Sequence, residues 1–412
     1  MAISLELPKG LQMLQQQSHQ VAQEVLRPIS RKYDLAEHEY PKELDMLAAL
    51  IDGMNDSGSS SGAGAAGGNG KPAEAKPEPK PEEEGVSKNG ANMASVVAVS
   101  EMCWGDVGLL LTMPRQGLGN SAIAAVANDE QKERFAGKWA AMAITEPEAG
   151  SDSAAIRTTA TLDGDEYVLN GEKIYVTSGD RAELIVVWAS LDPKLGRSAI
   201  KSFVVHRDNP GLKLDRLEHK LGIKASDTAN FILTDCRVPK EDLLGTPEID
   251  TKKSFSGVMK TFDNTRPLVA GMAVGLAKAC LDETRRILEE AGVEIDYDKP
   301  VNVQSKAAAE FIELEADYES ARLLMLEAAW MADNKKLNSL EASYSKAKAG
   351  RTGTDVALRC VALAGAVGYS ENSLLEKWAR DAKILDIFEG TQQIQLLIIA
   401  RQMLKLTSAE LR

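Results

Sequence analysis

The spacing of apolar residues changes twice along this chain of 412 residues. Apolar residues recur at helical intervals to about residue 138, alternate with polar residues from about 141 to 244, and return to helical intervals after 255. A chain of this length that is 44% hydrophobic exceeds one ordinary domain and can bury a large core. We therefore predict an α+β protein with an N-terminal helical domain over 1–140, a middle β domain (barrel or sandwich) over 141–245 and a C-terminal helical bundle over 253–412.

The predicted N-terminal domain is interrupted by a low-complexity insert. Residues 56–70 are almost all Gly, Ser, Ala and Asn, and residues 71–84 are Lys, Pro, Ala and Glu. Such a composition buries too little apolar surface to offset its ordering entropy, so we predict that the insert at 56–90 is a disordered, mobile loop whose role is open. Helices are predicted on either side of it, over 10–33, 41–54 and, with interruptions, 92–138.

The middle domain has the pattern of short strands. Two strand-like runs flank Asn170-Gly171, a pair that supplies the positive φ angles of a tight two-residue turn. We therefore predict a β-hairpin with its turn at Asn170-Gly171. Further strands are predicted over 183–190, 202–206 and 228–234.

The C-terminal domain is predicted to consist of long amphipathic helices, over 268–290, 303–332, 339–363, 372–385 and 392–404. Alanines and glycines recur in the first of them, at positions 270, 271, 273, 275, 277 and 279. Small side chains permit close contact between helices, which is typical of a helical bundle.

Charge and composition argue against several classes of function. A formal net charge of -13, without a basic stripe of interleaved aromatics, argues against nucleic acid as a partner. The four cysteines and four histidines are dispersed, so we predict reduced, mostly buried thiols and no metal. Neither a leader peptide nor an apolar run of about 18 residues is present, so we predict a cytoplasmic protein without membrane insertion.

One acidic residue near the C-terminus has apolar neighbours. Glu389 follows Ile387-Phe388 and precedes Gly390, between two predicted helices. Burial can raise the pKa of a carboxyl by up to roughly 3–5 units, which outweighs the opposing field of a helix N-terminus, about 0.3–1 kcal/mol. A desolvated Glu389 would therefore suit a proton-abstracting base. The alternative is an acidic residue that simply favours the start of the next helix.

A second candidate site lies where the first helical domain meets the strands. Residues 143–152, AITEPEAGSD, combine hydroxyl donors, a proline-fixed turn and small residues that let backbone amides approach a flat or anionic ligand. Ligand pockets favour such domain interfaces. An ordinary turn containing a Ser-Asp pair would explain the same string.

Four motifs occur in a specific order: AITEPEAGSDSAA at 143–155, IYVTSG at 174–179, FDNTRP at 262–267, and RDAKI at 380–384 leading into Glu389-Gly390-Thr391. In these motifs the chain resembles the acyl-CoA dehydrogenase family. The resemblance implies an N-terminal helical domain, a middle β domain and a C-terminal four-helix bundle. It also implies an FAD enzyme of fatty acid β-oxidation that converts an acyl-CoA to the trans-2-enoyl-CoA, passes electrons to an electron-transfer flavoprotein and forms a homodimer or homotetramer.

The resemblance also implies roles for individual residues. Glu389 matches the catalytic base, which removes the α proton while the β hydrogen leaves as hydride to the flavin, and its backbone N–H matches a donor to the thioester oxygen. Thr265 stands where some relatives carry the base instead, and a threonine cannot replace it. The matched cofactor contacts are Ile144, Thr145, Gly150, Ser151, Tyr175, Thr177 and Thr391, and the matched substrate contacts are Ser151, Asp263, Arg266 and Gly390.

Some assignments have ordinary alternatives. Asp263 and Arg266 could form a surface i,i+3 ion pair worth about 0.2–0.5 kcal/mol rather than hold CoA. Arg115 falls near the far end of the acyl pocket in relatives, where it could pair with the terminal carboxylate of a dicarboxylic acyl-CoA. A solvated surface arginine is the alternative for that residue.

Two departures from the family pattern concern contacts made across the dimer. The family's arginine after the first bundle helix is missing from residues 289–296, and its glutamine is missing near residues 362–368. FAD would then be held differently, loosely, or with an unlike subunit in a heteromer. We therefore keep two alternatives to the dehydrogenase: an acyl-CoA oxidase, and a flavin-poor partner subunit or acyl-CoA-binding protein.

Overall fold

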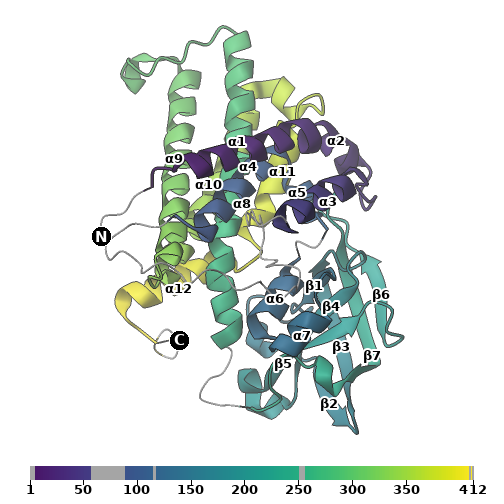
Figure 1. The fold of residues 1–412 in the computed structure, drawn as a ribbon. Helices are drawn as coiled ribbons and strands as arrows, with labels where there is room; N and C mark the ends of the chain where they lie inside the picture. Colours follow the sequence, from purple (N-terminus) through teal and green to yellow (C-terminus); the bar gives the residue numbers. More distant parts are fainter. Residues whose placement is uncertain (1–4, 57–88, 115–116, 250–255, 408–409, 411–412) are drawn as a thin grey trace.

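The computed structural model describes residues 5–56, 89–114, 117–249, 256–407 and 410. Most of the predicted mobile insert, residues 57–88, and Arg115 lie outside the described residues. Helices precede and follow one curved sheet, which confirms the predicted order of helical, β and helical regions (Figure 1). Within the described ranges, no helix is both long and apolar enough to span a membrane.

The N-terminal helices turn sharply where the sequence places small residues. Gly105 ends α4, and a Cβ there would lie 2.9 Å from the Cβ of Ala22. Asp106 then caps α5, because its side chain accepts a hydrogen bond of 2.8 Å from the backbone N–H of Leu109. The helices are α1 (Lys9–Val21), α2 (Arg27–Leu35), α3 (Glu43–Asp56), α4 (Ala91–Gly105), α5 (Val107–Leu111), α6 (Leu118–Val126) and α7 (Asp129–Arg134), with a π-helical turn at Ala22–Leu26.

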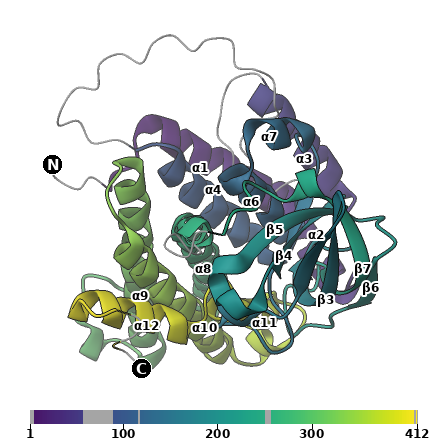
Figure 2. The same cartoon turned by 90° about the horizontal axis from the view of Figure 1, so that it is seen from below.

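The middle of the chain forms one sheet of seven strands, in the order β1-β4-β2-β3-β7-β6, with β5 paired to β4. The sheet curls around a core of its own, and α6 and α7 cover the outer side of β4 and β5 (Figures 1 and 2). β4, β5 and β7 confirm predicted strands, whereas β1, β2 and β6 were not predicted. The strands are β1 (Ala140–Ala143), β2 (Thr159–Asp163), β3 (Glu166–Thr177), β4 (Leu184–Ser190), β5 (Ile200–His206), β6 (Leu212–Leu217) and β7 (Thr228–Pro239).

The hairpin predicted at Asn170-Gly171 is wrong. β3 continues through both residues and pairs with β7 on either side of them, and the β2–β3 turn contains Gly164 instead. Asn170 faces an irregularity in β7, where its side-chain oxygen accepts a 2.8 Å hydrogen bond from the backbone of Asp235. At Gly171 a Cβ would lie 2.3 Å from the hydroxyl of Thr158. Asn-Gly therefore serves a bulge and a close approach here, which a local pattern cannot distinguish from a turn.

The C-terminal helices confirm the predicted segments, and α12 matches its prediction at both ends, but α8 begins at Ser256, ahead of the predicted start at 268. In Figure 2, α8 is seen end-on between α4 and the pair α9 and α10. At Gly275 in α8 a Cβ would lie 1.9 Å from the carbonyl oxygen of Ser100 in α4, so the small residues do permit close contact. The helices are α8 (Ser256–Glu290), α9 (Lys306–Asp333), α10 (Ser339–Tyr369), α11 (Leu375–Ala382) and α12 (Gln392–Leu404), with a 3₁₀ turn at Lys383–Asp386.

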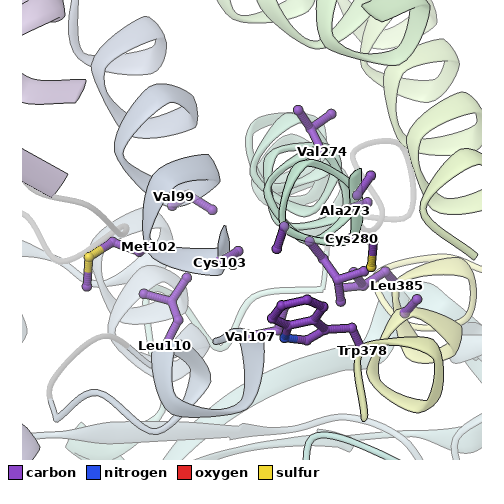
Figure 3. Packing of buried hydrophobic residues seen from close by; sticks show 14 of the residues in the cluster. Val99, Met102, Cys103, Val107, Leu110, Ala273, Val274, Cys280, Trp378 and Leu385 are labelled. Carbon is purple, nitrogen blue, oxygen red and sulfur yellow. The ribbon is translucent and has the colours of Figure 1, made fainter. Parts of the chain in front are cut away.

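The largest core joins the N-terminal and C-terminal helices. Trp378 of α11 packs among side chains of α5, α8 and the 3₁₀ turn, including Val107, Cys280 and Leu385 (Figure 3). All four cysteines are free and buried, in agreement with the predicted thiols. The two sets of helices therefore form one packed body rather than two separate bundles.

A buried ion cluster crosses this core. The Lys377 ammonium lies 2.6 Å from a carboxylate oxygen of Asp106 and 2.5 Å from one of Asp381, and all three side chains are fully buried. The other oxygen of Asp381 accepts a hydrogen bond from the backbone N–H of Ile223, in the segment between β6 and β7. Burial alone would lower the pKa of Lys377, but the charges of Asp106 and Asp381 outweigh it and raise that pKa. The cluster thus links α5, α11 and the sheet.

Replacing Lys377 with methionine should destabilise the protein by about 3–5 kcal/mol, because two buried carboxylates would lose their cation. The matched control is Lys348→Met, which removes a 2.7 Å pair with Asp317 near the surface. Such a pair contributes about 0–1 kcal/mol. Thermal denaturation of the two variants measures the difference, and equal losses would contradict the role given to Lys377.

Candidate active site

Glu389 stands in a strained turn ahead of α12. Its φ is 55° and that of Gly390 is 90°, so two consecutive residues have left-handed backbone conformations. Such a conformation is unfavourable for a residue other than glycine and is common at functional sites. The helix itself begins at Gln392 and is capped by Thr391, whose hydroxyl accepts a 3.3 Å hydrogen bond from the backbone N–H of Ile394. Glu389 is therefore not an acidic residue of the first helical turn.

The turn is held by side chains from two helices. The ammonium of Lys346, buried in α10, donates a 2.7 Å hydrogen bond to the carbonyl oxygen of Gly390. The side-chain amide of Gln395 lies 3.3 Å from the carbonyl oxygen of Glu389 and 3.2 Å from that of Gly390. A Cβ at Gly390 would lie 2.4 Å from the same amide nitrogen. These contacts hold the Glu389–Gly390 and Gly390–Thr391 peptide planes of the turn.

The carboxyl of Glu389 is surrounded by protein although the residue is only half-buried. Burial raises its pKa, and this effect exceeds three opposing ones: a hydrogen bond of 2.9 Å from the Thr265 hydroxyl and the charges of Lys346 and Arg266. Burial likewise lowers the pKa of Lys346 to about 8, against the nearby charges of Asp386 and Glu389. The structure thus brings a carboxyl of raised proton affinity together with a hydroxyl and two cationic side chains.

The motif at 143–155 follows β1 and is anchored by a buried ion pair. The carboxylate of Glu146 lies 2.7 Å from the ammonium of Lys173 and accepts hydrogen bonds from the backbones of Arg157 and Thr158, at 2.6 and 3.0 Å. Burial lowers the pKa of Lys173 to about 8. Burial alone would raise the pKa of Glu146, but the charge of Lys173 and the hydrogen bonds from Lys173, Thr158 and Arg157 together lower it. The loop is therefore fixed at its centre by a fully buried pair.

The same loop is joined to β3 beside the predicted flavin contacts. The backbone N–H of Ile174 donates a 2.9 Å hydrogen bond to the carbonyl oxygen of Thr145, and Lys173 donates one of 3.1 Å to the carbonyl of Ile144. The next residue, Tyr175, has a φ of 58° and is 61% exposed. Thr177 is partly exposed at the end of the strand. Backbone bonds therefore bring the 144–145 and 175–177 segments together.

These residues fit the flat aromatic ring of FAD. The exposed ring of Tyr175 and the partly exposed Thr177 are available on β3, where the residues on either side of Tyr175, Ile174 and Val176, are buried. Gly150 and Ser151 lie at the exposed end of the loop, and nothing lies within 4 Å of a Cβ built at Gly150. The chain can therefore offer both aromatic surface and hydrogen-bonding groups to a flavin.

The remaining predicted residues are placed as follows. Arg266 is buried in α8, and its charge is one of those that oppose the raised pKa of Glu389. The side chain of Asp263 and the whole of Arg115 lie outside the described residues. Sequence reasoning assigned no role to Glu146, Lys173, Lys346 or Gln395, because their partners come from distant parts of the chain or from the backbone of the turn.

Comparison with known proteins identifies the class defined by this fold and site. The model "Acyl-CoA dehydrogenase, middle domain" matches residues 141–236, and "Acyl-CoA dehydrogenase, C-terminal domain" matches residues 255–404. The short-chain specific acyl-CoA dehydrogenase of Bos taurus mitochondria is 33% identical over 402 residues, which cover 98% of this chain and 92% of the relative. Acryloyl-CoA reductase (NADH) of Anaerotignum propionicum is 31% identical over 417 residues, covering 98% and 96%.

A solved structure agrees with these matches. Butyryl-CoA dehydrogenase from Megasphaera elsdenii aligns with a TM-score of 0.80 and 27% identity over 98% of this chain and 100% of that one. The chain belongs to the acyl-CoA dehydrogenase family. It is accordingly an FAD-dependent oxidoreductase, which confirms the class and cofactor implied by the sequence motifs.

Replacing Lys173 with methionine should loosen the 143–158 segment, because the buried Glu146 carboxylate would lose its cation and water would have to reach it. We expect faster amide hydrogen exchange in peptides that cover this segment, measured by mass spectrometry. Lys213→Met, at an exposed position of β6, is the matched control. Unchanged exchange in the Lys173 variant would show that the ion pair does not hold the loop.

Proposed function

We propose that Glu389 removes the α proton of an acyl-CoA thioester during its α,β-dehydrogenation to the trans-2-enoyl-CoA. The observation that supports this most directly is the desolvated Glu389 carboxyl, held at 2.9 Å by Thr265 in a turn whose backbone is fixed by Lys346. A general base works best when its pKa approaches the operating pH, and burial moves Glu389 in that direction. FAD, when bound, supplies the acceptor for the β hydrogen.

The fixed turn also suits stabilisation of the developing enolate. An α proton beside a thioester is weakly acidic, so the thioester oxygen needs hydrogen-bond donors as its charge grows. We assign one such donor to the backbone N–H of Glu389, at the start of the turn whose next two carbonyl oxygens, those of Glu389 and Gly390, accept hydrogen bonds from Gln395 and Lys346. Loss of one donor of this kind typically costs about 2.7–4 kcal/mol of transition-state stabilisation.

Binding roles are proposed for the other matched residues. Ile144, Thr145, Gly150, Tyr175 and Thr177 would line the flavin, together with Thr391, whose hydroxyl also caps α12. Ser151, Arg266 and Gly390 would contact the substrate, with Asp263 at the CoA portion. The short-chain and butyryl-CoA relatives favour a short acyl chain. Arg115 as a partner of a terminal carboxylate stays a hypothesis, tested by comparing dicarboxylic and plain acyl-CoA of equal length.

The local charge near the missing cross-dimer arginine favours loose or altered FAD binding. At the end of α8, Glu289 and Glu290 are exposed, and Glu290 pairs with Arg286 at 2.6 Å, so this arginine is already engaged. Acidic residues beside a pyrophosphate would weaken its binding.

We propose a cytoplasmic homodimer or homotetramer with an electron-transfer flavoprotein as acceptor. Hydrogen peroxide release in air would instead indicate an oxidase, and purified protein lacking FAD would indicate a partner subunit.

Glu389→Gln should abolish bleaching of the flavin absorbance by short-chain acyl-CoA under anaerobic conditions while the protein stays yellow. The amide keeps the size of the side chain but cannot accept the proton, so we expect a loss of at least about 100-fold in the bleaching rate. Stopped-flow absorbance spectroscopy measures this rate. Wild-type protein that binds FAD but is not bleached by any acyl-CoA would refute the proposed function, and a bleaching Glu389→Gln variant would refute the role of this residue.

Thr265→Val should shift the acid limb of the pH–rate profile to higher pH. Glu389 must be ionised to act as a base, and the Thr265 hydroxyl stabilises the ionised form, so its removal raises the pKa of Glu389 further. Activity would then be lost at a higher pH as the solution is acidified. Thr265→Ser keeps a hydroxyl and should retain the wild-type profile. Superimposable profiles for all three proteins would show that this hydrogen bond does not tune the base.

A further inference from the structure

Two histidines that are far apart in the sequence meet at the boundary between the N-terminal helices and the sheet. His38 lies in the turn after α2, and His219 lies between β6 and β7. Their ring centroids are 5.0 Å apart, and Nδ1 of His219 lies 2.9 Å from a carboxylate oxygen of Glu37. One ligand atom from each of these three residues lies within 4.8 Å of the others.

The imidazole of His38 lacks hydrogen-bond partners among the described residues. Both ring nitrogens are shielded from solvent, and neither has a hydrogen-bond partner among the described residues. Buried polar groups without partners are rare, because each loses its hydration without compensation. Burial also lowers the pKa of His38, which favours the neutral imidazole that metals bind. A ligand that accepts a nitrogen lone pair would satisfy one of the two ring nitrogens.

The backbone holds His38 in place for such a role. Its φ is 72°, a left-handed conformation that is uncommon for residues other than glycine. The guanidinium of Arg181, which also pairs with Asp227 at 3.3 Å, donates a 3.3 Å hydrogen bond to the carbonyl oxygen of His38. The strained turn is therefore tied to the sheet segment that follows β3, and the imidazole is positioned before any ligand arrives.

We propose that Glu37, His38 and His219 form a binding site for Zn²⁺ or a similar borderline divalent metal, between the N-terminal helices and the sheet. Two imidazoles and one carboxylate are a donor set that zinc accepts, with a fourth position left for water, whereas Mg²⁺ and Ca²⁺ prefer oxygen ligands. Spacing along the chain gave no sign of this site, because its two histidines are 181 positions apart (219 minus 38). The site is independent of the proposed catalytic function.

Lysine side chains near Glu37 should lower the affinity of the proposed site for a metal ion, and removing one of them tests the proposal. The Lys224 ammonium lies 4.0 Å from the Glu37 carboxylate, and the Lys220 side chain donates to the carbonyl of Ser226 close by. A lysine near the carboxylate repels a divalent cation and competes for its ligand. Removing the charge of Lys224 should therefore tighten metal binding, whereas an adventitious surface site elsewhere would not respond.

The test is isothermal titration calorimetry of the metal-stripped, FAD-loaded protein with ZnCl₂. We expect one Zn²⁺ per chain, a loss of affinity of about tenfold or more in His219→Ala and in Glu37→Gln, and a gain in Lys224→Gln. His219 is exposed, so its variant should fold normally. The matched control is His19→Ala, because His19 pairs with Glu101 at the same 2.9 Å but has no second histidine beside it among the described residues.

Electron paramagnetic resonance of Cu²⁺ bound to the same protein identifies the ligands. The spectrum should show coupling to two imidazole nitrogens in the wild type and to one in either His38→Ala or His219→Ala. No zinc binding by the wild-type protein, or binding unaffected by both His219→Ala and Glu37→Gln, would overturn the proposal. An equal loss of affinity in the His19 control would also do so.

Discussion

The Lys377 cluster is the interaction on which the relative placement of the parts depends. Asp106 comes from the N-terminal helices, Lys377 and Asp381 come from α11, and the backbone of Ile223 comes from the segment between β6 and β7. Each charge is fully buried, so no member can be satisfied by water if one element shifts. Because Asp381 precedes Glu389 by eight positions, the same cluster fixes the start of the segment that carries the proposed base.

A second buried pair plays a similar part at the flavin loop. Glu146 of the 143–155 segment is enclosed with Lys173 of β3. Lys173 and the next residue of that strand, Ile174, donate the hydrogen bonds to the carbonyl oxygens of Ile144 and Thr145. Buried ion pairs contribute little net stability compared with apolar residues of the same size. The role of this pair is geometric, since its hydrogen bonds and charges join the loop to β3 two residues before the exposed Tyr175.

The sequence allowed prediction of what depends on local spacing. The helix at 392–404 and the order of the three regions follow from apolar periodicity, and the burial of the Glu389 carboxyl was expected from its apolar neighbours. Partners brought together by tertiary structure were not predictable: Lys377 meets Asp106 across 271 positions, and Lys346 meets Gly390 across 44. The Asn170-Gly171 error has the same origin, because the irregularity in β7 that faces these residues lies more than 60 positions away.

The chemistry proposed for Glu389 requires opposing effects to be nearly balanced. Burial alone would keep the carboxyl protonated, and full solvation would make it too weak a base, so Thr265, Arg266 and Lys346 must recover part of the ionised form. Lys346, with its pKa lowered to about 8, is still mainly charged in the neutral range where that ionisation matters. Above that pH it would lose its charge but keep N–H groups, so its hydrogen bond to Gly390 can persist. Lys346 can therefore hold the turn on both sides of pH 8, and it favours the Glu389 carboxylate at the lower pH values where the lysine is charged.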